Sequence, residues 1–148
     1  MTGGNVDIKI TTVIYPIDTD ENESNDVQTE EINVKGVLRK KDDSIYLFYE
    51  EKEPDSGCIT RNSVKIEGGK SVTRTCSGYK ASTMRFVDGS ETATNYVTKY
   101  GTFAMKFMTN YVSVTETDKE IRVSIEYILS VDSAPIGNQQ LTIWVKYS

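Results

Sequence analysis

The chain of 148 residues is 37% hydrophobic and 26% charged, a composition typical of one globular domain (1–148). Its net charge of -5 argues against nucleic-acid binding, which needs clustered Lys and Arg, and the absence of histidine excludes Ser-His-Asp and Cys-His catalysis. Because neither a signal peptide nor an apolar run of membrane-spanning length is visible, we expect a cytoplasmic protein without metal, cofactor, nucleic-acid or membrane partner.

Apolar and polar residues alternate along most of the chain, a pattern typical of strands separated by short turns. The first strand, VDIKITTVI (6–14), precedes an acidic segment, 18–27, that we expect to be a mobile loop. Its sequence DTDENES resembles a calcium-binding loop. However, Glu23 stands where that loop needs glycine, and Thr29 stands where it needs a bidentate glutamate. We therefore expect no metal there.

Turn length decides whether neighbouring strands place their apolar residues on one face. A two-residue turn at Asp42-Asp43 does so, because it sets Leu38 opposite Leu47. Asp88-Gly89 marks another turn, between the segments STMRFV and ETATNYV. These segments are predicted to follow one another as hairpins.

The glycine-rich turn EGGK (67–70) admits two registers. A three-residue loop with a glycine bulge pairs Ile66 with Val72 and Val64 with Arg74, whereas a two-residue loop opposes apolar to polar residues. We prefer the former, which places Arg74 on the apolar inner face. An inward guanidinium must be paired or hydrogen-bonded. It either anchors a carboxylate or phosphate of a ligand, or it forms internal ion pairs or carbonyl contacts.

The same register determines how far apart the two cysteines lie. Cys76 faces Asn62, and Cys58 lies four residues further along, about 13 Å at the usual strand rise. This separation is too large for a disulfide. We predict two free thiols, neither of them catalytic, because no histidine is present to activate them.

The segment YVTKYGTFAMKFMTNY (96–111) is rich in aromatic residues and methionine. Gly101 after Tyr100 indicates a turn or kink, and the apolar alternation slips between Phe107 and Met108, which predicts a bulge. Such a segment either lines a pocket or fills the core, since methionine packs well in irregular spaces.

The last three strands are predicted to share one apolar face through turns at 118–119 and 133–137. The expected pairs are Val112–Ile125, Met108–Leu129, Leu129–Leu141 and Tyr127–Ile143. In this register Asn110 and Tyr127 lie opposite each other on the inner face. Both are then candidates to bind a ligand together with Arg74.

The opposite face of these strands carries a predicted row of Tyr111, Glu126 and Trp144. Exposed aromatic patches often mark protein interfaces, so this row is a candidate homodimer contact. The alternative is isolated surface aromatics, covered by a loop or by the N-terminal strand.

About eight to ten strands in sequential hairpins would expose two long edges unless the sheet closed on itself. The sequence therefore predicts an all-β fold, an antiparallel meander β-barrel. A small barrel is either filled by its own side chains or holds one small ligand.

The order and spacing of five segments resemble a bacterial family, the YwiB-like domain of unknown function. The segments are GVLRKKDDSIYLFYEE, KIEGGKSVTRT, STMRFVDG, YVTKYGTFAMKF and IRVSIEYIL. The resemblance runs from about Ile8 to Tyr147, and it implies a calycin-type barrel, similar to lipocalins, with no established activity. Two positions depart from expectation: Lys99 replaces the proline common before Tyr-Gly, and the only tryptophan, Trp144, is not in a Gly-x-Trp on the first strand. The resemblance therefore names no lipid ligand.

Two functions follow from the barrel. The first is binding of a small amphipathic or anionic molecule inside it. The candidate contacts are Arg74, Asn110, Tyr127, Tyr100 and Met108. The second is a non-catalytic interaction module or homodimer with a filled barrel, which uses the outer aromatic row. An enzyme is disfavoured, because without histidine the acid or base would be a perturbed carboxylate, lysine or tyrosine. A cavity favours the first function, and a solid core with Arg74 paired to a carboxylate favours the second.

Overall fold

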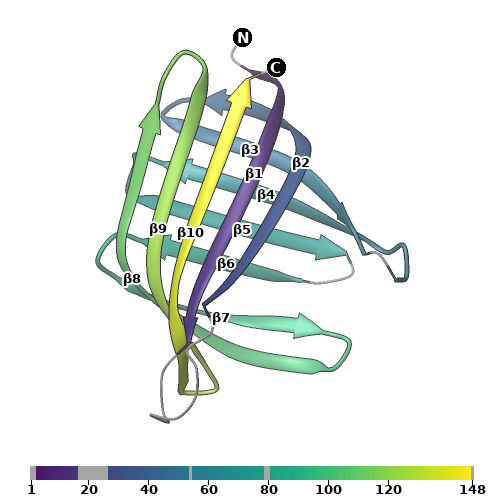
Figure 1. The fold of residues 1–148 in the computed structure, drawn as a ribbon, viewed down its shortest axis with the longest axis vertical. Coiled ribbons are helices and arrows are strands. Elements are labelled where there is room, and N and C mark those ends of the chain that lie inside the picture. The colour runs from purple at the N-terminus through teal and green to yellow at the C-terminus, as the bar shows by residue number, and fades with distance from the viewer. Residues whose placement is uncertain (1–2, 17–26, 54, 79–80, 148) are drawn as a thin grey trace.

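The computed structural model describes residues 3–16, 27–53, 55–78 and 81–147, which form ten antiparallel strands and no helix (Figure 1). The strands are β1 (Gly3–Pro16), β2 (Gln28–Lys41), β3 (Ser44–Lys52), β4 (Ile59–Glu67), β5 (Ser71–Gly78), β6 (Ser82–Val87), β7 (Glu91–Thr98), β8 (Gly101–Glu116), β9 (Glu120–Val131) and β10 (Ala134–Tyr147). Within these ranges no helix is long and apolar enough to cross a membrane. The expected acidic loop (18–27), with its calcium-like sequence, lies outside the described residues except for Val27, which is exposed.

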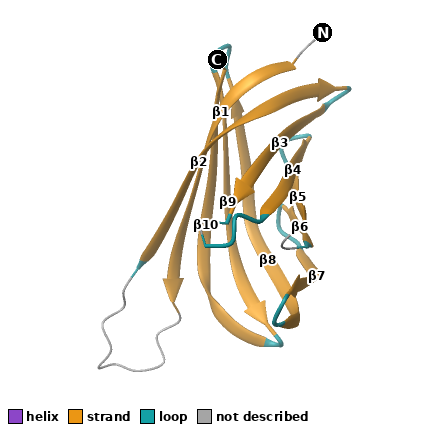
Figure 2. Ribbon diagram, turned by 90° about the vertical axis from the view of Figure 1, so that its right-hand side faces the viewer, coloured by secondary structure: helices purple, strands orange, loops and turns teal. Residues whose placement is uncertain are grey.

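The strands form one sheet in the order β6-β5-β4-β3-β2-β1-β10-β9-β8-β7. Each strand therefore pairs with its sequence neighbours, except where β1 also pairs with β10 and where β6 and β7 separate. The sheet curls so that β3–β6 pass behind β8–β10, and β1 and β2 connect the two walls (Figures 1 and 2). This is a nearly closed, all-β meander barrel, as the alternation in the sequence predicts.

The barrel closes at a seam between β6 and β7. The predicted turn at Asp88-Gly89 is present, with a Ser90 N–H to Val87 O hydrogen bond of 2.9 Å. The flanking strands then diverge instead of forming the expected hairpin, and β7 forms its ladder with β8. Across the seam, Ala81 and Val97 form an isolated bridge, which closes the barrel only loosely.

The predicted registers of the middle hairpins are confirmed. Leu38 lies opposite Leu47, and Val64 lies opposite Arg74 across the three-residue glycine loop. Asn62 faces Cys76, and both cysteines are free thiols. In each case a turn with Gly or Asp fixes the register, because these residues adopt the positive φ angles that tight turns require.

The predicted register of β8 is wrong at its middle. The bulge lies at Asn110, because the inward alternation continues to Thr109 before the strand slips by one residue. Met108 therefore pairs with Ile128, not with Leu129, and lies on the outer face. Beyond the bulge the register is as predicted, with Val112 opposite Ile125.

The predicted turn at 133–137 is also wrong. The chain turns at Asp132-Ser133, and both residues adopt positive φ angles, 49° and 70°, typical of a type I′ turn. Tyr127 consequently lies opposite Gln139 rather than Ile143. The shift is an even number of residues, so the apolar residues of β10 still face the core, and the predicted face survives the wrong register.

Candidate functional site

The inner faces of β3–β6 change from apolar to polar along the strands. Nearest the 42–43 turn, one row across the sheet consists of buried Ile45, Ile66, Val72 and Phe86. Two rows further along, the corresponding residues are Tyr49, Asn62, Cys76 and Ser82. We call these the apolar row and the polar row. Arg74 lies in the row between them, flanked by Val64 and Met84.

The apolar half of the interior is filled by its own side chains. Phe86 is fully buried and packs against Phe107 and Tyr127, with ring centroids 5.1 and 4.7 Å away. The Tyr127 hydroxyl donates a hydrogen bond of 2.6 Å to Oε1 of buried Gln139. Burial raises the pKa of Tyr127 to about 12, although the nearby charge of Arg74 acts to lower it. Tyr127 is thus a core residue and does not line a cavity.

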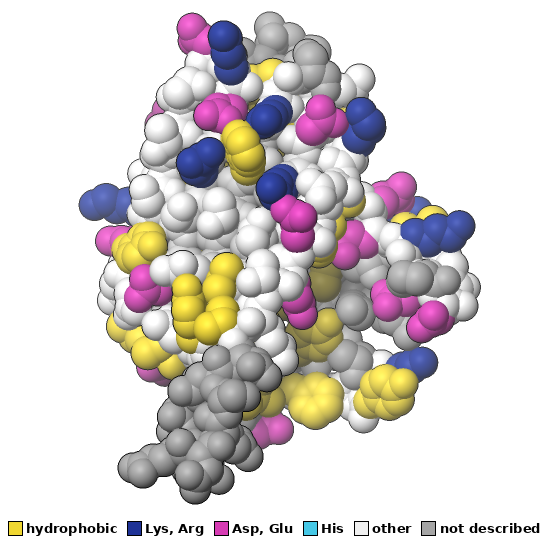
Figure 3. All heavy atoms as spheres, in the orientation of Figure 1, with side chains coloured by type: hydrophobic (Ala, Val, Ile, Leu, Met, Phe, Trp, Pro, Cys, Tyr) yellow, Lys and Arg dark blue, Asp and Glu magenta, His cyan; other side chains and the backbone are white. Residues whose placement is uncertain are grey.

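The polar half contains a cavity of about 250 Å³. Its lining comes from strands on both sides of the barrel, including Ile10 and Thr12 of β1, Glu30 and Ile32 of β2, and Tyr96 of β7. Figure 3 shows the molecule hollowed between the face of β1 and β2 and the lobe formed by the ends of β3 and β4. Hydrophobic side chains lie at the base of this hollow, and acidic side chains lie around it.

Arg74 is partly buried and lines this cavity. Its Nη2 donates a hydrogen bond of 3.1 Å to the Tyr49 hydroxyl. None of the ion pairs in the described part of the chain involves Arg74. Burial acts to lower the pKa of Arg74, but interactions with Tyr49, Tyr127 and Glu51 outweigh it and raise the pKa, so the guanidinium stays charged.

The remaining cavity wall is held by short hydrogen-bond networks. Asn62 donates from Nδ2 to Glu51 Oε1 and to the Thr60 carbonyl, both at 3.3 Å. The Cys76 Sγ lies 3.3 Å from the Ser82 Oγ. These bonds fix the orientation of the polar groups that line the cavity.

Three other predicted ligand contacts do not line the cavity. Asn110 sits at the bulge, is exposed, and donates a hydrogen bond of 3.1 Å to Glu126 on the outer face. Met108 is 37% exposed, because the bulge follows it rather than precedes it. Tyr100 is 81% exposed, in the two-residue turn between β7 and β8. The segment 96–111 thus belongs mainly to the β7–β8 hairpin, and of its described side chains Tyr96 alone lines this cavity.

The predicted outer row is divided. Tyr111 pairs with Glu126, but Trp144 pairs with Arg122, four residues along β9. The cause is the turn at 132–133, which shifts β10 relative to β9. The Trp144 indole N–H donates to Glu120.

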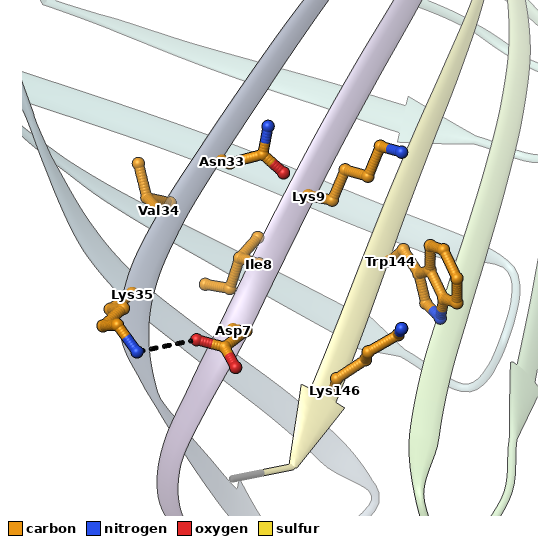
Figure 4. Close-up of a pocket in the computed structure, with 8 residues that line it drawn as sticks. All are labelled: Asp7, Ile8, Lys9, Asn33, Val34, Lys35, Trp144 and Lys146. Atoms are coloured by element: carbon orange, nitrogen blue, oxygen red, sulfur yellow. Dashed lines mark hydrogen bonds and ion pairs between the residues drawn. The ribbon is translucent and has the colours of Figure 1, made fainter.

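Basic side chains cover the Trp144 ring. The ring centroid is 4.1 Å from Lys146 Nζ, 4.8 Å from Arg122 Cζ and 5.9 Å from Lys9 Nζ. Figure 4 shows Lys9 and Lys146 on either side of this tryptophan, beside the ion pair of Lys35 with Asp7. Trp144 is therefore part of a charged outer surface and not of an aromatic patch with Tyr111.

The sequence contained a partial signal for the cavity residues that were not predicted. The alternation that turns Tyr49 inward also turns Glu51 inward, and the register that places Arg74 inward does the same for Asn62 and Thr60. By contrast, Glu30 and Tyr96 reach the cavity only because the barrel closes. No local pattern shows that.

The fold and the cavity define a class of protein: a nearly closed ten-stranded meander barrel, half filled by its core and half occupied by a polar cavity. Residues 8–143 match the model of a family described as "Domain of unknown function (DUF1934)", and the chain belongs to this family. The crystal structure of the ywiB protein from Bacillus subtilis has the same fold, with a TM-score of 0.80 and 22% identity over 99% of this chain and 93% of that one. No curated protein matches the chain. The resemblance noted in the sequence is confirmed, and the function of the family is unknown.

Proposed function

We propose that this protein binds a small polar or amphipathic molecule in the 250 Å³ cavity, with Arg74 as its anchor, and that it does so without catalysis. One observation carries the proposal: Arg74 is a partly buried charge that lines a cavity and donates a hydrogen bond to the hydroxyl group of Tyr49 instead of forming an ion pair with a carboxylate. A guanidinium has five N–H donors. Those that Tyr49 does not use are available to an acceptor on a ligand.

The energetic argument favours a ligand over a structural role. A charge that leaves water costs several kcal/mol unless it is paired and hydrogen-bonded. A core that needed only stability would hold an apolar residue at Arg74, between Val64 and Met84. A ligand carboxylate or phosphate would supply the missing partner, in the bidentate geometry that arginine prefers.

The size of the cavity supports a small ligand. Sites for drug-sized molecules have volumes of about 300–1,000 Å³, and this cavity lies just below that range. Since the buried aromatic rings of Phe86 and Phe107 fill the other half of the barrel, a long acyl chain has no room to extend inward.

The proposal includes a calycin-type barrel in a bacterial cytoplasm. The meander of sequential strands, in which β1 also pairs with β10, and a cavity within the barrel support the calycin type. The free thiols of Cys58 and Cys76 suit a reducing compartment. The proposal of binding without catalysis rests on the lack of histidine in the chain. In addition, no three Cys, Asp or Glu side chains of the described residues gather as metal ligands do.

A homodimer through the outer face is the competing proposal, and it has less support. The aromatic residues of the predicted row are separated, and the Trp144 ring lies beneath Lys9, Arg122 and Lys146. A two-fold dimer brings the same patch of both copies together, so this contact would place basic side chains against one another.

Native mass spectrometry of the protein purified from its own host tests the proposal. We expect a noncovalent small molecule that is released on denaturation and is lost from the Arg74→Ala variant. Arg61→Ala is the matched control, because Arg61 lies on the neighbouring strand but points outward to Glu50. An apo mass for the wild-type protein, also after incubation with a host metabolite extract, would contradict the proposal. The same spectra report whether the protein is a dimer.

A further inference from the structure

The cavity carries charges of both signs. Among the lining residues that the structure describes, Arg74 is the one cation, whereas Glu30, Glu51 and Glu53 are acidic. A site for a simple anion would not place three carboxylates around its single guanidinium, because they repel the ligand that the guanidinium attracts. A site for a simple cation would not leave a guanidinium without an anionic partner.

The backbone positions that carry the two signs are offset along the strands. Arg74 lies in the row of Val64 and Met84, next to the apolar half of the barrel. Glu51 lies two rows further along, opposite Thr60, and Glu53 follows it beyond the end of β3. Two rows correspond to about 13 Å along the strand direction. Arg74 and Glu51 form no ion pair, although the charge of Glu51 helps to raise the pKa of Arg74.

Burial differs less than position does, since Arg74, Glu51 and Glu53 are all partly buried and Glu30 of β2 is exposed. The cavity thus has one basic position next to the apolar half of the barrel and acidic positions further along the strands, of which Glu30 is the most exposed. Between them, Ile10, Ile32 and Met84 provide an apolar wall that suits methylene groups.

We infer, resting on the function proposed above, that the ligand is a small zwitterion: an acidic group bound by Arg74 and an amino group bound by the glutamates, joined by a short aliphatic chain. Such a molecule satisfies both signs at once. A ligand with one charge leaves the opposite end of the cavity desolvated and unpaired, which costs affinity. The exposed carboxylate of Glu30 also attracts the amino end first and so orients the molecule as it enters.

Three compounds of nearly equal length test the inference: 6-aminohexanoate, hexanoate and hexylamine. Isothermal titration calorimetry and NMR shift mapping on the wild-type protein measure the affinity of each and locate its site. We expect 6-aminohexanoate to bind at least about tenfold more tightly than either singly charged compound. Hexanoate or hexylamine binding as tightly as 6-aminohexanoate would overturn the inference in favour of an anionic or cationic ligand, and would leave the proposed binding function intact.

Variants that each remove one charge test which residue binds which end of 6-aminohexanoate. Arg74→Gln should weaken 6-aminohexanoate to the level of hexylamine, and Glu51→Gln should weaken it to the level of hexanoate. Glu50→Gln is the matched control, because Glu50 is adjacent in sequence but points outward to Arg61. If Glu51→Gln changes the affinity no more than Glu50→Gln, the glutamate end of the inference is wrong. Thermal melts of all three variants verify that each is folded.

The remaining outcomes separate the inference from the function on which it rests. If none of the three compounds binds and native mass spectrometry finds a retained molecule without an amino group, the zwitterion inference fails and the binding function stands. A retained molecule with both acidic and amino groups supports the inference. If no compound binds and the protein is apo, both fail together.

Discussion

The apolar row and the polar row of β3–β6 lie two rows apart on the same wall of the barrel. Their inward side chains nevertheless differ in polarity. The apolar row, from Ile45 to Phe86, is buried. In the polar row, Asn62, Cys76 and Ser82 bring an amide, a thiol and a hydroxyl group to one side of a cavity. Backbone pairing is equally regular in both. The difference teaches that the ladder determines the shape, while the inward side chains divide the interior into a packed core and a polar cavity, which is the proposed binding site.

Among the variants that test this comparison, Phe86→Ala in the apolar row is expected to lower the stability most. Phe86 is fully buried and contacts two other aromatic rings. Removal of its ring leaves a cavity that the surrounding side chains cannot fill, so the free energy of unfolding should fall by about 3–5 kcal/mol. Urea denaturation measures the change. Asn62→Ala, in the polar row, is the control, and an equal loss in both variants would show that the two rows do not differ in this way.

A pH titration should give the next largest effect, through Tyr127. Burial raises the pKa of its hydroxyl to about 12 in the folded protein, from 10.0 in the unfolded chain. Between about pH 10 and 12 the unfolded chain releases this proton first, so the stability that is present below pH 10 is lost as the pH rises. The loss attributable to this group is about 2–3 kcal/mol.

The Tyr127→Phe variant isolates that effect. It cannot titrate at this position, so its unfolding free energy should fall less steeply than that of the wild-type protein between pH 10 and 12. The variant starts from a lower stability, by about 1–3 kcal/mol, because buried Gln139 loses its hydrogen-bond donor. Parallel slopes in the two proteins would mean that Tyr127 does not titrate differently on unfolding.

The smallest effect on stability is expected at Arg74. Arg74→Met removes a desolvated charge but also the hydrogen bond to Tyr49, and these opposing contributions should leave the free energy of unfolding within about 1 kcal/mol of the wild type. Ligand retention, in contrast, should be abolished. A loss of stability as large as that of Phe86→Ala would show that the guanidinium stabilises the fold. It would then contradict the contrast between a stabilising core and a binding cavity on which the proposed function depends.

The sequence predicts much of this wall, because local chemistry specifies it. Period-two alternation identifies the strands, and the turns at 42–43 and 68–70 carry Asp or Gly that can adopt positive φ. Arg74 is consequently placed inward from sequence alone. At Asp132-Ser133 both residues adopt positive φ, although serine rarely does so, and the Asp132 amide is held by a tertiary hydrogen bond to the Ala104 carbonyl. A contact of that kind has no local signature.

The cavity is harder to predict than the wall for a related reason. Its far side comes from β1, β2 and β7, which approach β5 only when the sheet curls and the seam at Ala81 and Val97 closes. The bulge at Asn110 likewise depends on how β8 bends to follow that curvature. Closure of the barrel brings residues that are far apart in the chain into contact, whereas the alternation of apolar and polar residues predicts only the orientation of side chains within each strand.

The position of β10 has a consequence for synthesis on the ribosome. It is the last strand in the chain, yet it joins β1 to β9 in the middle of the sheet. Until it emerges, the nascent chain can form two separate ladders, β1–β6 and β7–β9, each with an open edge and an uncovered apolar face. Exposed edges of this kind aggregate readily. We therefore expect the nascent chain to need chaperone protection until Ala134–Tyr147 has left the exit tunnel and the two ladders can join.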